Sequence, residues 1–223
     1  MVETRLPNNS QRTVIVGRTG TGKTIAGMWH LSKKNFATFP WIVWDTKRDT
    51  ELKELWQLPA VKRLTFSDMP GKSGLYYIQP LPHEMEDQAC EDFLWKIHKR
   101  GKIGLYFDEG YALDKYSKAL AALYTQGRSL HIPMITLSQR PSHLNLFTFT
   151  EMEFLQVFDL NYLGDRKRIA EYSRIDPRYS LREYHSLWYD VKANSVVEFS
   201  PVPAPDLVLE SFEAQLRLIK RAI

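Results

Sequence analysis

The sequence predicts an α/β fold with a mostly parallel central sheet flanked by helices, and two observations support that prediction. First, short apolar runs rich in β-branched and aromatic residues alternate with helix-forming segments along most of the chain. Second, the apolar run at residues 13–16 leads into a glycine-rich turn and then into a helical segment. Strands that alternate with helices at this spacing indicate a parallel sheet covered on both faces.

The glycine-rich turn has the spacing G-x-x-x-x-G-K-[ST] of a phosphate-binding loop. Its glycines let backbone N–H groups surround a phosphate, and the N-terminus of the following helix adds the positive end of its dipole. We expect Lys23 to reach the β- and γ-phosphates and the Thr24 hydroxyl to bind Mg²⁺, with ATP as the nucleotide. The alternative is a glycine-rich turn without a ligand. The predicted nucleotide-binding residues are Gly17, Thr19, Gly20, Thr21, Gly22, Lys23 and Thr24.

Length and composition restrict the class of protein. The 223 residues suffice for one α/β domain, and 43% hydrophobic with 25% charged residues is typical of a soluble globular protein. The net charge of +4 permits a polyanionic partner but does not require one. Cys90 is the only cysteine, which excludes an internal disulfide and fits a reducing compartment. We expect neither a signal peptide nor a membrane span, since the start is polar and no apolar stretch approaches ~20 residues.

In chain order, residues 1–12 are expected to form a polar arm, residues 13–200 a phosphate-loop ATPase domain, and residues 201–223 a proline-rich linker followed by an amphipathic helix. Within the domain, strands are predicted at 13–17, 41–44, 63–66, 75–78, 103–107, 133–138 and 153–160. Helices are predicted at 25–34, 51–56, 84–99, 113–126 and 164–173, and a β-hairpin at 186–199. The tail helix either packs on its own domain or docks on a neighbouring subunit.

Polar residues follow several of the predicted strands, at the edge where an open parallel sheet binds its ligands. Asp108 is expected to hold Mg²⁺ through a bound water, and Glu109 to polarise the attacking water as general base. Gln139 is expected to sense the γ-phosphate or, alternatively, to cap the end of its strand. The role of Asp45 stays open, because it could position water or metal or contact a neighbouring subunit. Lys47 could simply be a solvated charge.

Arg128 follows Gly127 at the end of a predicted helix, away from the nucleotide of its own chain. We expect it to enter the site of an adjacent protomer and to neutralise charge in the transition state. The alternative is a surface arginine that complements the dipole of its helix. Arg140 and Arg18 could substitute for it.

Together these motifs resemble the FtsK–HerA superfamily of P-loop ATPases. The resemblance rests on the phosphate loop, on Asp45-Thr46-Lys47 after the next strand, and on Leu105-Tyr106-Phe107-Asp108-Glu109-Gly110. Its most discriminating part is the stretch from Gly127-Arg128 to Ser138-Gln139-Arg140-Pro141. The segment 154–175 is similar to the strand and helix that close the motor core of that superfamily. The match covers roughly residues 12–176.

The resemblance implies a RecA-like (ASCE) core in which the strands before Glu109 and before the phosphate loop flank the strand before Gln139. It implies a ring of five or six subunits that moves double-stranded DNA. It also implies Lys23 and Thr24 as nucleotide ligands, Asp108 as metal ligand, Glu109 as base, Gln139 as sensor and Arg128 as arginine finger. Lys72 and the turn at 99–102 are candidates for DNA contacts, or else solvated charges.

A bare motor of this size is most similar to the genome-packaging ATPases of tectivirus-like, membrane-containing phages and of archaeal icosahedral viruses. That similarity implies a capsid vertex or viral membrane proteins as further partners. It implies action in the host cytoplasm during infection, or at the packaging vertex of the virion. Other interpretations are an assembly or secretion ATPase like those of filamentous phages, which would push protein or single-stranded DNA, a small-molecule phosphotransferase, or a nucleotide-switched structural protein.

Overall fold

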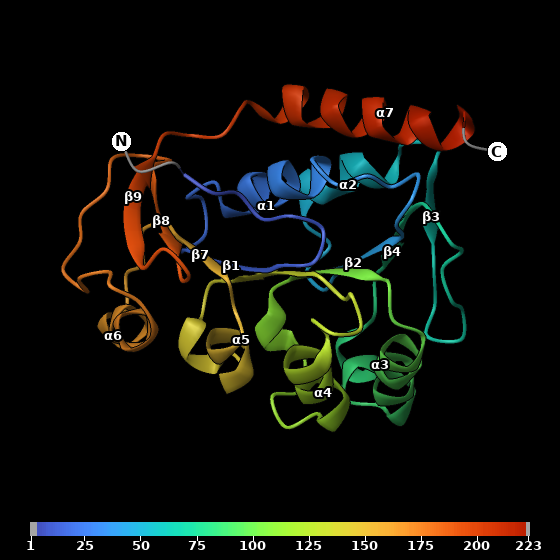
Figure 1. The fold of residues 1–223 in the computed structure, drawn as a ribbon, viewed down its shortest axis with the longest axis horizontal. Coiled ribbons are helices and arrows are strands. Elements are labelled where there is room, and N and C mark those ends of the chain that lie inside the picture. The colour runs from blue at the N-terminus through green and yellow to red at the C-terminus, as the bar shows by residue number, and fades with distance from the viewer. Residues whose placement is uncertain (1–3, 222–223) are drawn as a thin grey trace.

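A nine-stranded sheet runs through the computed structural model, which describes residues 4–221 (Figure 1). The strand order is β3-β4-β2-β5-β6-β1-β7-β8-β9. The first seven strands in this order are parallel, and β8 and β9 continue the sheet in the antiparallel sense. The strands are β1 (Arg12–Val16), β2 (Trp41–Asp45), β3 (Val61–Arg63), β4 (Leu75–Ile78), β5 (Gly104–Asp108), β6 (Met134–Ser138), β7 (Phe154–Val157), β8 (Ser186–Asp190) and β9 (Ser195–Phe199).

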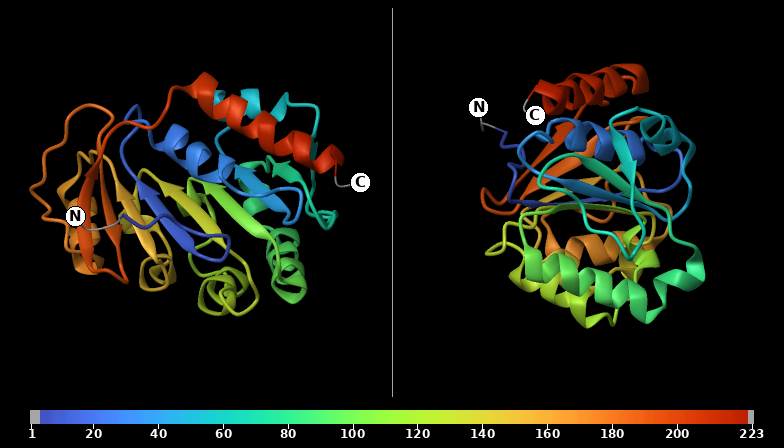
Figure 2. Two further views of the ribbon diagram at one scale, coloured as in Figure 1. Left: turned by 45° about the horizontal axis from the view of Figure 1, so that its top comes forward. Right: turned by 90° about the vertical axis from the view of Figure 1, so that its right-hand side faces the viewer.

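Helices cover both faces of the sheet, as Figures 1 and 2 show. Helices α1 (Lys23–Ser32) and α2 (Thr50–Trp56) lie on one face, and α7 (Pro205–Arg221) packs over them as an additional layer. The opposite face carries α3 (Gln88–Arg100), α4 (Lys118–Gln126), α5 (Leu146–Thr150) and α6 (Leu163–Tyr172). Every residue of β1, β2, β5 and β6 is buried, because these central strands have a helical layer on each side. The predicted fold class is therefore confirmed.

The strand order places β6 between β5 and β1. The strands that precede Glu109 and the phosphate loop thus flank the strand that precedes Gln139, as the superfamily resemblance implied. The carboxyl ends of all three strands meet at one edge of the sheet, because the three strands are parallel. This edge carries the candidate site.

The predicted helices differ from the observed ones in three places. The segment predicted as one helix at 84–99 is a 3₁₀ turn at Pro82–Met85 followed by α3. The helix predicted from residue 113 begins at Lys118, because the Ser117 hydroxyl caps it by accepting from the N–H of Leu120. Helix α5 was not predicted, since its five residues are too few to show a helical period.

Both ends of the described chain pack against the domain. In the predicted arm, the side chain of Arg5 pairs with Asp190, and the Trp188 indole donates to the Arg5 carbonyl at 3.1 Å. Residues 1–3 of this arm, and residues 222–223 of the predicted tail, lie outside the described residues. At the other end, the buried Phe212 of α7 stacks on Phe36 with ring centroids 6.0 Å apart. Of the two arrangements considered for the tail helix, the structure shows packing on its own domain.

Candidate nucleotide-binding and catalytic site

The phosphate loop connects β1 to α1, and its backbone requires glycine at several positions. Gly20 and Gly22 have φ angles of +79° and +89°, in the region that side chains disfavour. A Cβ on Gly17 would lie 2.6 Å from Cβ of Phe158. Gly22 immediately precedes Lys23, the first residue of α1, so the N-terminus of α1 opens onto the loop.

A cavity of about 240 Å³ lies against this loop. Polar side chains from the loop, from the start of α2 and from the end of β6 surround it, which suits a charged, phosphate-bearing ligand. Of the predicted nucleotide-binding residues, five line this cavity directly. The full lining is Arg18, Thr19, Gly20, Gly22, Lys23, Thr24, Lys47, Asp49, Thr50, Glu51 and Gln139.

Asp108 ends β5 and is 1% exposed, and neither of its carboxylate oxygens has a hydrogen-bond partner. Burial raises the pKa of Asp108 to about 7, against the opposing effect of the Lys23 charge. A buried carboxylate without partners is costly unless a cation compensates it. The unpaired oxygens therefore fit a metal ion at this position.

Mg²⁺ is the cation that this donor set suits best. It is usually held by one or two protein oxygens together with substrate phosphates and water, so it needs no cage of protein ligands. The Thr24 hydroxyl and the Asp108 carboxylate are the oxygens that would hold it.

Glu109 follows Asp108 and lies at the centre of a hydrogen-bond network. Its Oε1 accepts from Nζ of Lys47 at 2.5 Å and from Nζ of Lys23 at 3.2 Å, and its Oε2 accepts from the N–H of Gln139 at 2.9 Å. Burial alone would raise the pKa of Glu109, but the Lys23 charge and the bonds from Lys47 and Gln139 outweigh it and lower the pKa. These contacts favour the ionised form of the carboxylate, which is the form that a general base requires.

The backbone of Glu109 has a φ of +59°, which a residue with a side chain rarely adopts. Such strain is concentrated at functional sites, where the surrounding structure maintains it. At Glu109 the three hydrogen bonds provide that constraint.

Gln139 forms hydrogen bonds both to Glu109 and to the phosphate loop. Its backbone N–H donates to Glu109, and its side-chain Oε1 accepts from the Thr19 hydroxyl at 2.8 Å. Because one residue contacts both the base and the phosphate loop, it is placed to respond to a phosphate between them. Its role as a sensor stays a prediction.

Asp45 lies at the same edge but is already satisfied within the fold. Its carboxylate accepts from the Trp56 indole at 3.1 Å, from the Gln79 amide at 2.7 Å and from the backbone N–H of Asp49 at 3.1 Å. These bonds attach α2 to the sheet, which is a structural role. Its neighbour Lys47, for which the sequence left a solvated position open, is the residue that reaches the site. The signal in the sequence was its position just after a strand that ends at this edge.

The structure does not bring Arg128 to the site of its own chain. It is exposed in the turn between α4 and β6, and so lies at the amino edge of the sheet, opposite Gln139. The two predicted substitutes lie at the carboxyl edge. There Arg18 pairs with Asp159 at 3.0 Å and Arg140 with Asp165 at 3.8 Å. The role of Arg128 as an arginine finger in a neighbouring subunit stays a prediction, because the structure contains a single chain.

The similarity of this chain to a known protein extends over nearly its whole length. No protein-family model matches the sequence. The DNA packaging ATPase P9 of Enterobacteria phage PRD1 is 40% identical over 219 residues, which cover 94% of this chain and 95% of P9. None of the helices within residues 4–221 has the length and apolar character needed to cross a membrane.

Solved structures share the fold at low sequence identity. The genome packaging NTPase B204 of Sulfolobus turreted icosahedral virus 2, in complex with AMPPCP, has a TM-score of 0.68 at 19% identity, covering 88% of this chain and 100% of B204. ATPases 2 and 3 of EssC from Geobacillus thermodenitrificans have a TM-score of 0.61 at 15% identity, covering 95% of this chain and 44% of theirs. The predicted resemblance to P-loop packaging ATPases is confirmed, and the chain belongs to the family of the PRD1 DNA packaging ATPase P9.

Proposed function

We propose that this protein is an ATP-hydrolysing motor that packages double-stranded viral DNA into a capsid. The observation that supports it most strongly is the buried Glu109 carboxylate, which accepts from Lys23 of the phosphate loop and follows the unpaired Asp108. A protein that only binds nucleotide has no need of a buried, strained base next to a metal ligand. Because the chain belongs to the family of the DNA packaging ATPase P9, we infer that ATP hydrolysis drives DNA packaging.

Each residue of the site has its own role in the proposed hydrolysis of ATP. Backbone N–H groups of the phosphate loop and Lys23 hold the phosphates, so Lys23 exchanges Glu109 for the β/γ-phosphates when ATP binds. Thr24 and Asp108 would hold Mg²⁺, which when bound would neutralise charge on the phosphates. Glu109 then accepts a proton from the attacking water. Lys47 and the N–H of Gln139 keep the Glu109 carboxylate oriented while this happens.

The direct test is the rate of ATP hydrolysis with and without long duplex DNA. We expect DNA to stimulate hydrolysis by the intact protein, and Glu109→Gln to reduce hydrolysis by about 10²- to 10⁴-fold both with and without DNA. A hydrolysis rate that does not respond to duplex DNA would contradict a DNA motor. A hydrolysis rate in Glu109→Gln close to that of the intact protein would contradict the assignment of the base.

We expect the motor to work as a ring of five or six subunits. Arg128 supports this arrangement, because it is exposed at the edge of the sheet opposite its own nucleotide and would be free to enter the site of a neighbour. Mixing Arg128→Ala subunits with Glu109→Gln subunits tests the idea. Activity should reappear in mixed rings, where some interfaces combine an intact arginine with an intact base. Mixtures that stay as inactive as the two variants alone would remove Arg128 from this role.

A basic surface at the amino edge of the sheet is the proposed DNA contact. The Arg100 guanidinium donates to the carbonyls of Pro70 and Gly71 and so holds the turn at 70–74 against the end of α3. This interaction gathers the exposed Lys72, Lys99 and Lys102 at one edge of the sheet. Lysines in such a cluster bind phosphates without reading sequence, and the binding weakens with salt.

Replacing Lys72, Lys99 and Lys102 together by alanine should weaken duplex binding. It should also reduce the slope of log K against log salt by about 0.9 for each phosphate that the lysines no longer neutralise. Hydrolysis without DNA should be unchanged, because these side chains lie at the edge opposite the nucleotide. A salt slope equal to that of the intact protein would place the DNA elsewhere.

We further expect the motor to act in the infected host cytoplasm and at the packaging vertex, docked on capsid or viral membrane proteins.

A further inference from the structure

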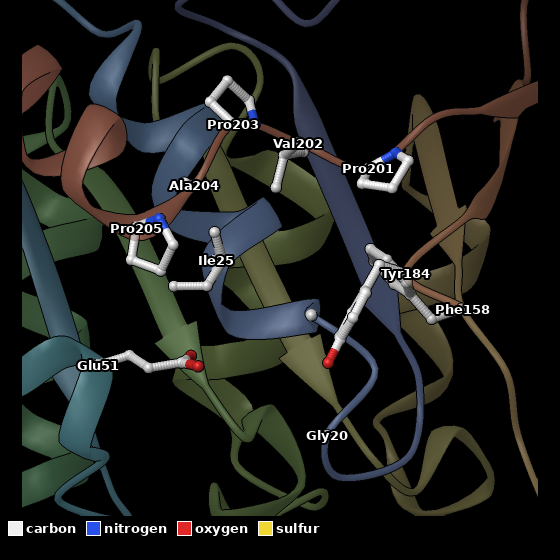
Figure 3. Close-up of a pocket in the computed structure, with 11 residues that line it drawn as sticks. Gly20, Ile25, Glu51, Phe158, Tyr184, Pro201, Val202, Pro203, Ala204 and Pro205 are labelled. Atoms are coloured by element: carbon white, nitrogen blue, oxygen red, sulfur yellow. The ribbon is translucent and has the colours of Figure 1, made fainter. Parts of the chain in front are cut away.

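A second cavity, of about 400 Å³, opens beside the phosphate cavity (Figure 3). Gly20, Gly22 and Glu51 line both cavities, so the two adjoin along the phosphate loop. Apart from Glu51, the side chains of the larger cavity are apolar or aromatic, in contrast to the polar lining of the smaller one. They are Ile25, Phe158, Tyr184, Pro201, Val202, Pro203, Ala204 and Pro205.

Tyr184 is the residue that most clearly indicates a ligand. Its ring lies over the phosphate loop, since a Cβ on Gly22 would be 3.3 Å from its Cδ1. Figure 3 shows the ring beside Phe158 with its hydroxyl directed toward the loop. Tyr184 is 48% exposed and has a φ of +58°, a costly conformation for an aromatic residue. A strained backbone that presents an open aromatic face to a cavity is typical of a stacking surface.

The segment 201–205 borders the other side of the cavity and runs from the end of β9 into Pro205, the first residue of α7. Three of its five residues are proline, which fixes the backbone and offers no N–H donor. Its far end is held in place because α7 packs on α1 through Val208 and Phe212. In this apolar border only the backbone N–H groups of Val202 and Ala204 could donate to the edge of a flat ring, because the three prolines have none.

We infer that this cavity binds the nucleoside part of the triphosphate, with a purine base stacked on Tyr184 and the ribose hydroxyls donating to Glu51. The shared border with the phosphate cavity supports this occupant, because a ligand with its phosphates on the loop would extend past Glu51 into the apolar space. Among the described residues that line the cavity, Glu51 is the single charged side chain. The cavity therefore binds purines more tightly than pyrimidines, because a purine offers a larger area for stacking. It discriminates only weakly between adenine and guanine. This inference rests on the proposed function.

Isothermal titration with ATP and with inorganic tripolyphosphate tests it. Tripolyphosphate occupies only the phosphate loop, so it reports on that loop alone. We expect Tyr184→Ala to weaken ATP binding roughly 5- to 100-fold, the range for loss of one stacked base, and to leave tripolyphosphate affinity unchanged. Tyr184→Phe keeps the ring and should bind ATP like the intact protein. Tyr116→Ala, which removes a 79% exposed tyrosine outside both cavities, is the matched control and should have no effect.

Two further measurements complete the test. Glu51→Gln should weaken ATP binding but not binding of 2′,3′-dideoxy-ATP, which lacks the hydroxyls. GTP should compete with ATP within about tenfold, and CTP should compete less well. Tyr184→Ala that weakens ATP and tripolyphosphate equally, or neither, would overturn the inference, as would a strong preference for ATP over GTP. An intact protein that binds neither ATP nor tripolyphosphate would instead overturn the proposed function.

Discussion

Nζ of Lys47 lies 2.5 Å from Oε1 of Glu109, closer than Nζ of Lys23, which lies 3.2 Å from the same oxygen. In the proposed mechanism Lys23 moves to the phosphates once ATP binds, whereas Lys47 stays on Glu109. Lys47 is therefore the partner that can keep Glu109 ionised and oriented throughout the cycle. The Lys47 side chain is 33% exposed and that of Glu109 is 1% exposed. Lys47 therefore lies between the buried Glu109 carboxylate and the cavity that it lines.

Lys47→Met should lower kcat for ATP hydrolysis by roughly 10- to 100-fold, because a buried carboxylate that loses its closest cation is less well positioned as a base. The Kd for ATP should change little, since Lys23 and the loop backbone bind the phosphates. Steady-state kinetics and nucleotide titration separate the two effects. Lys47→Arg should recover most of the activity, and Lys53→Met, on the exposed side of α2, should have none of these effects. A fully active Lys47→Met protein would show that Glu109 needs no such partner.

Glu109→Gln should reduce kcat by about 10²- to 10⁴-fold, the usual contribution of a general base. The amide oxygen can still accept from the N–H of Gln139, so the strained turn should remain folded and ATP should still bind. Glu171→Gln, at an exposed position of α6, is the matched control. Loss of ATP binding together with hydrolysis would mean that Glu109 acts through the fold and not as a base.

Stability should fall in mild acid because of His30. This side chain is buried and shares a hydrogen bond of 2.9 Å between its Nε2 and Oε1 of Gln156. Burial, opposed by the hydrogen bond with Gln156 and aided by the nearby charge of Lys34, lowers the pKa of His30 to about 4. The unfolded chain, with an ordinary histidine pKa near 6.5, therefore takes up a proton that the folded protein excludes.

The consequence is a loss of stability that begins as the pH falls below about 6.5 and is complete near pH 4. Between pH 7 and pH 5, His30 should account for a loss of about 2 kcal/mol in the free energy of unfolding, measured by urea titration. In His30→Gln the same acidification should cost about 2 kcal/mol less than in the intact protein. Equal acid sensitivity in both proteins would mean that His30 is protonated in the folded state.

Phe212→Ala should destabilise the protein by about 3–5 kcal/mol, because it removes a fully buried ring that stacks on Phe36 beneath α7. Leu218→Ala, on the exposed side of the same helix, should change stability by less than about 0.5 kcal/mol. Chemical denaturation of both variants makes the comparison. A small effect of Phe212→Ala would indicate that α7 contributes little to the folded domain.

Most of the sheet could be predicted from the sequence, since buried parallel strands appear as short apolar runs bounded by glycine, proline or polar residues. Helix starts were less certain. The start of α4 depends on the Ser117 cap, which the apolar pattern around it did not reveal. Helix α5 and the 3₁₀ turn at Pro82–Met85 are too short to produce a period at all.

The sequence by itself determined the phosphate loop, because eight consecutive residues suffice to place glycines, lysine and threonine around a phosphate. Only the tertiary structure decided which residues share that site. The contacts of Glu109 with Lys47 and Lys23 span 62 and 86 residues, and they exist because β2, β5, β6 and β1 are neighbours in the sheet. The same arrangement engages Asp45 in the fold, leaves Arg128 at the opposite edge and brings residues 201–205 beside the loop. Strand order is set by packing across the whole domain, which no local pattern records.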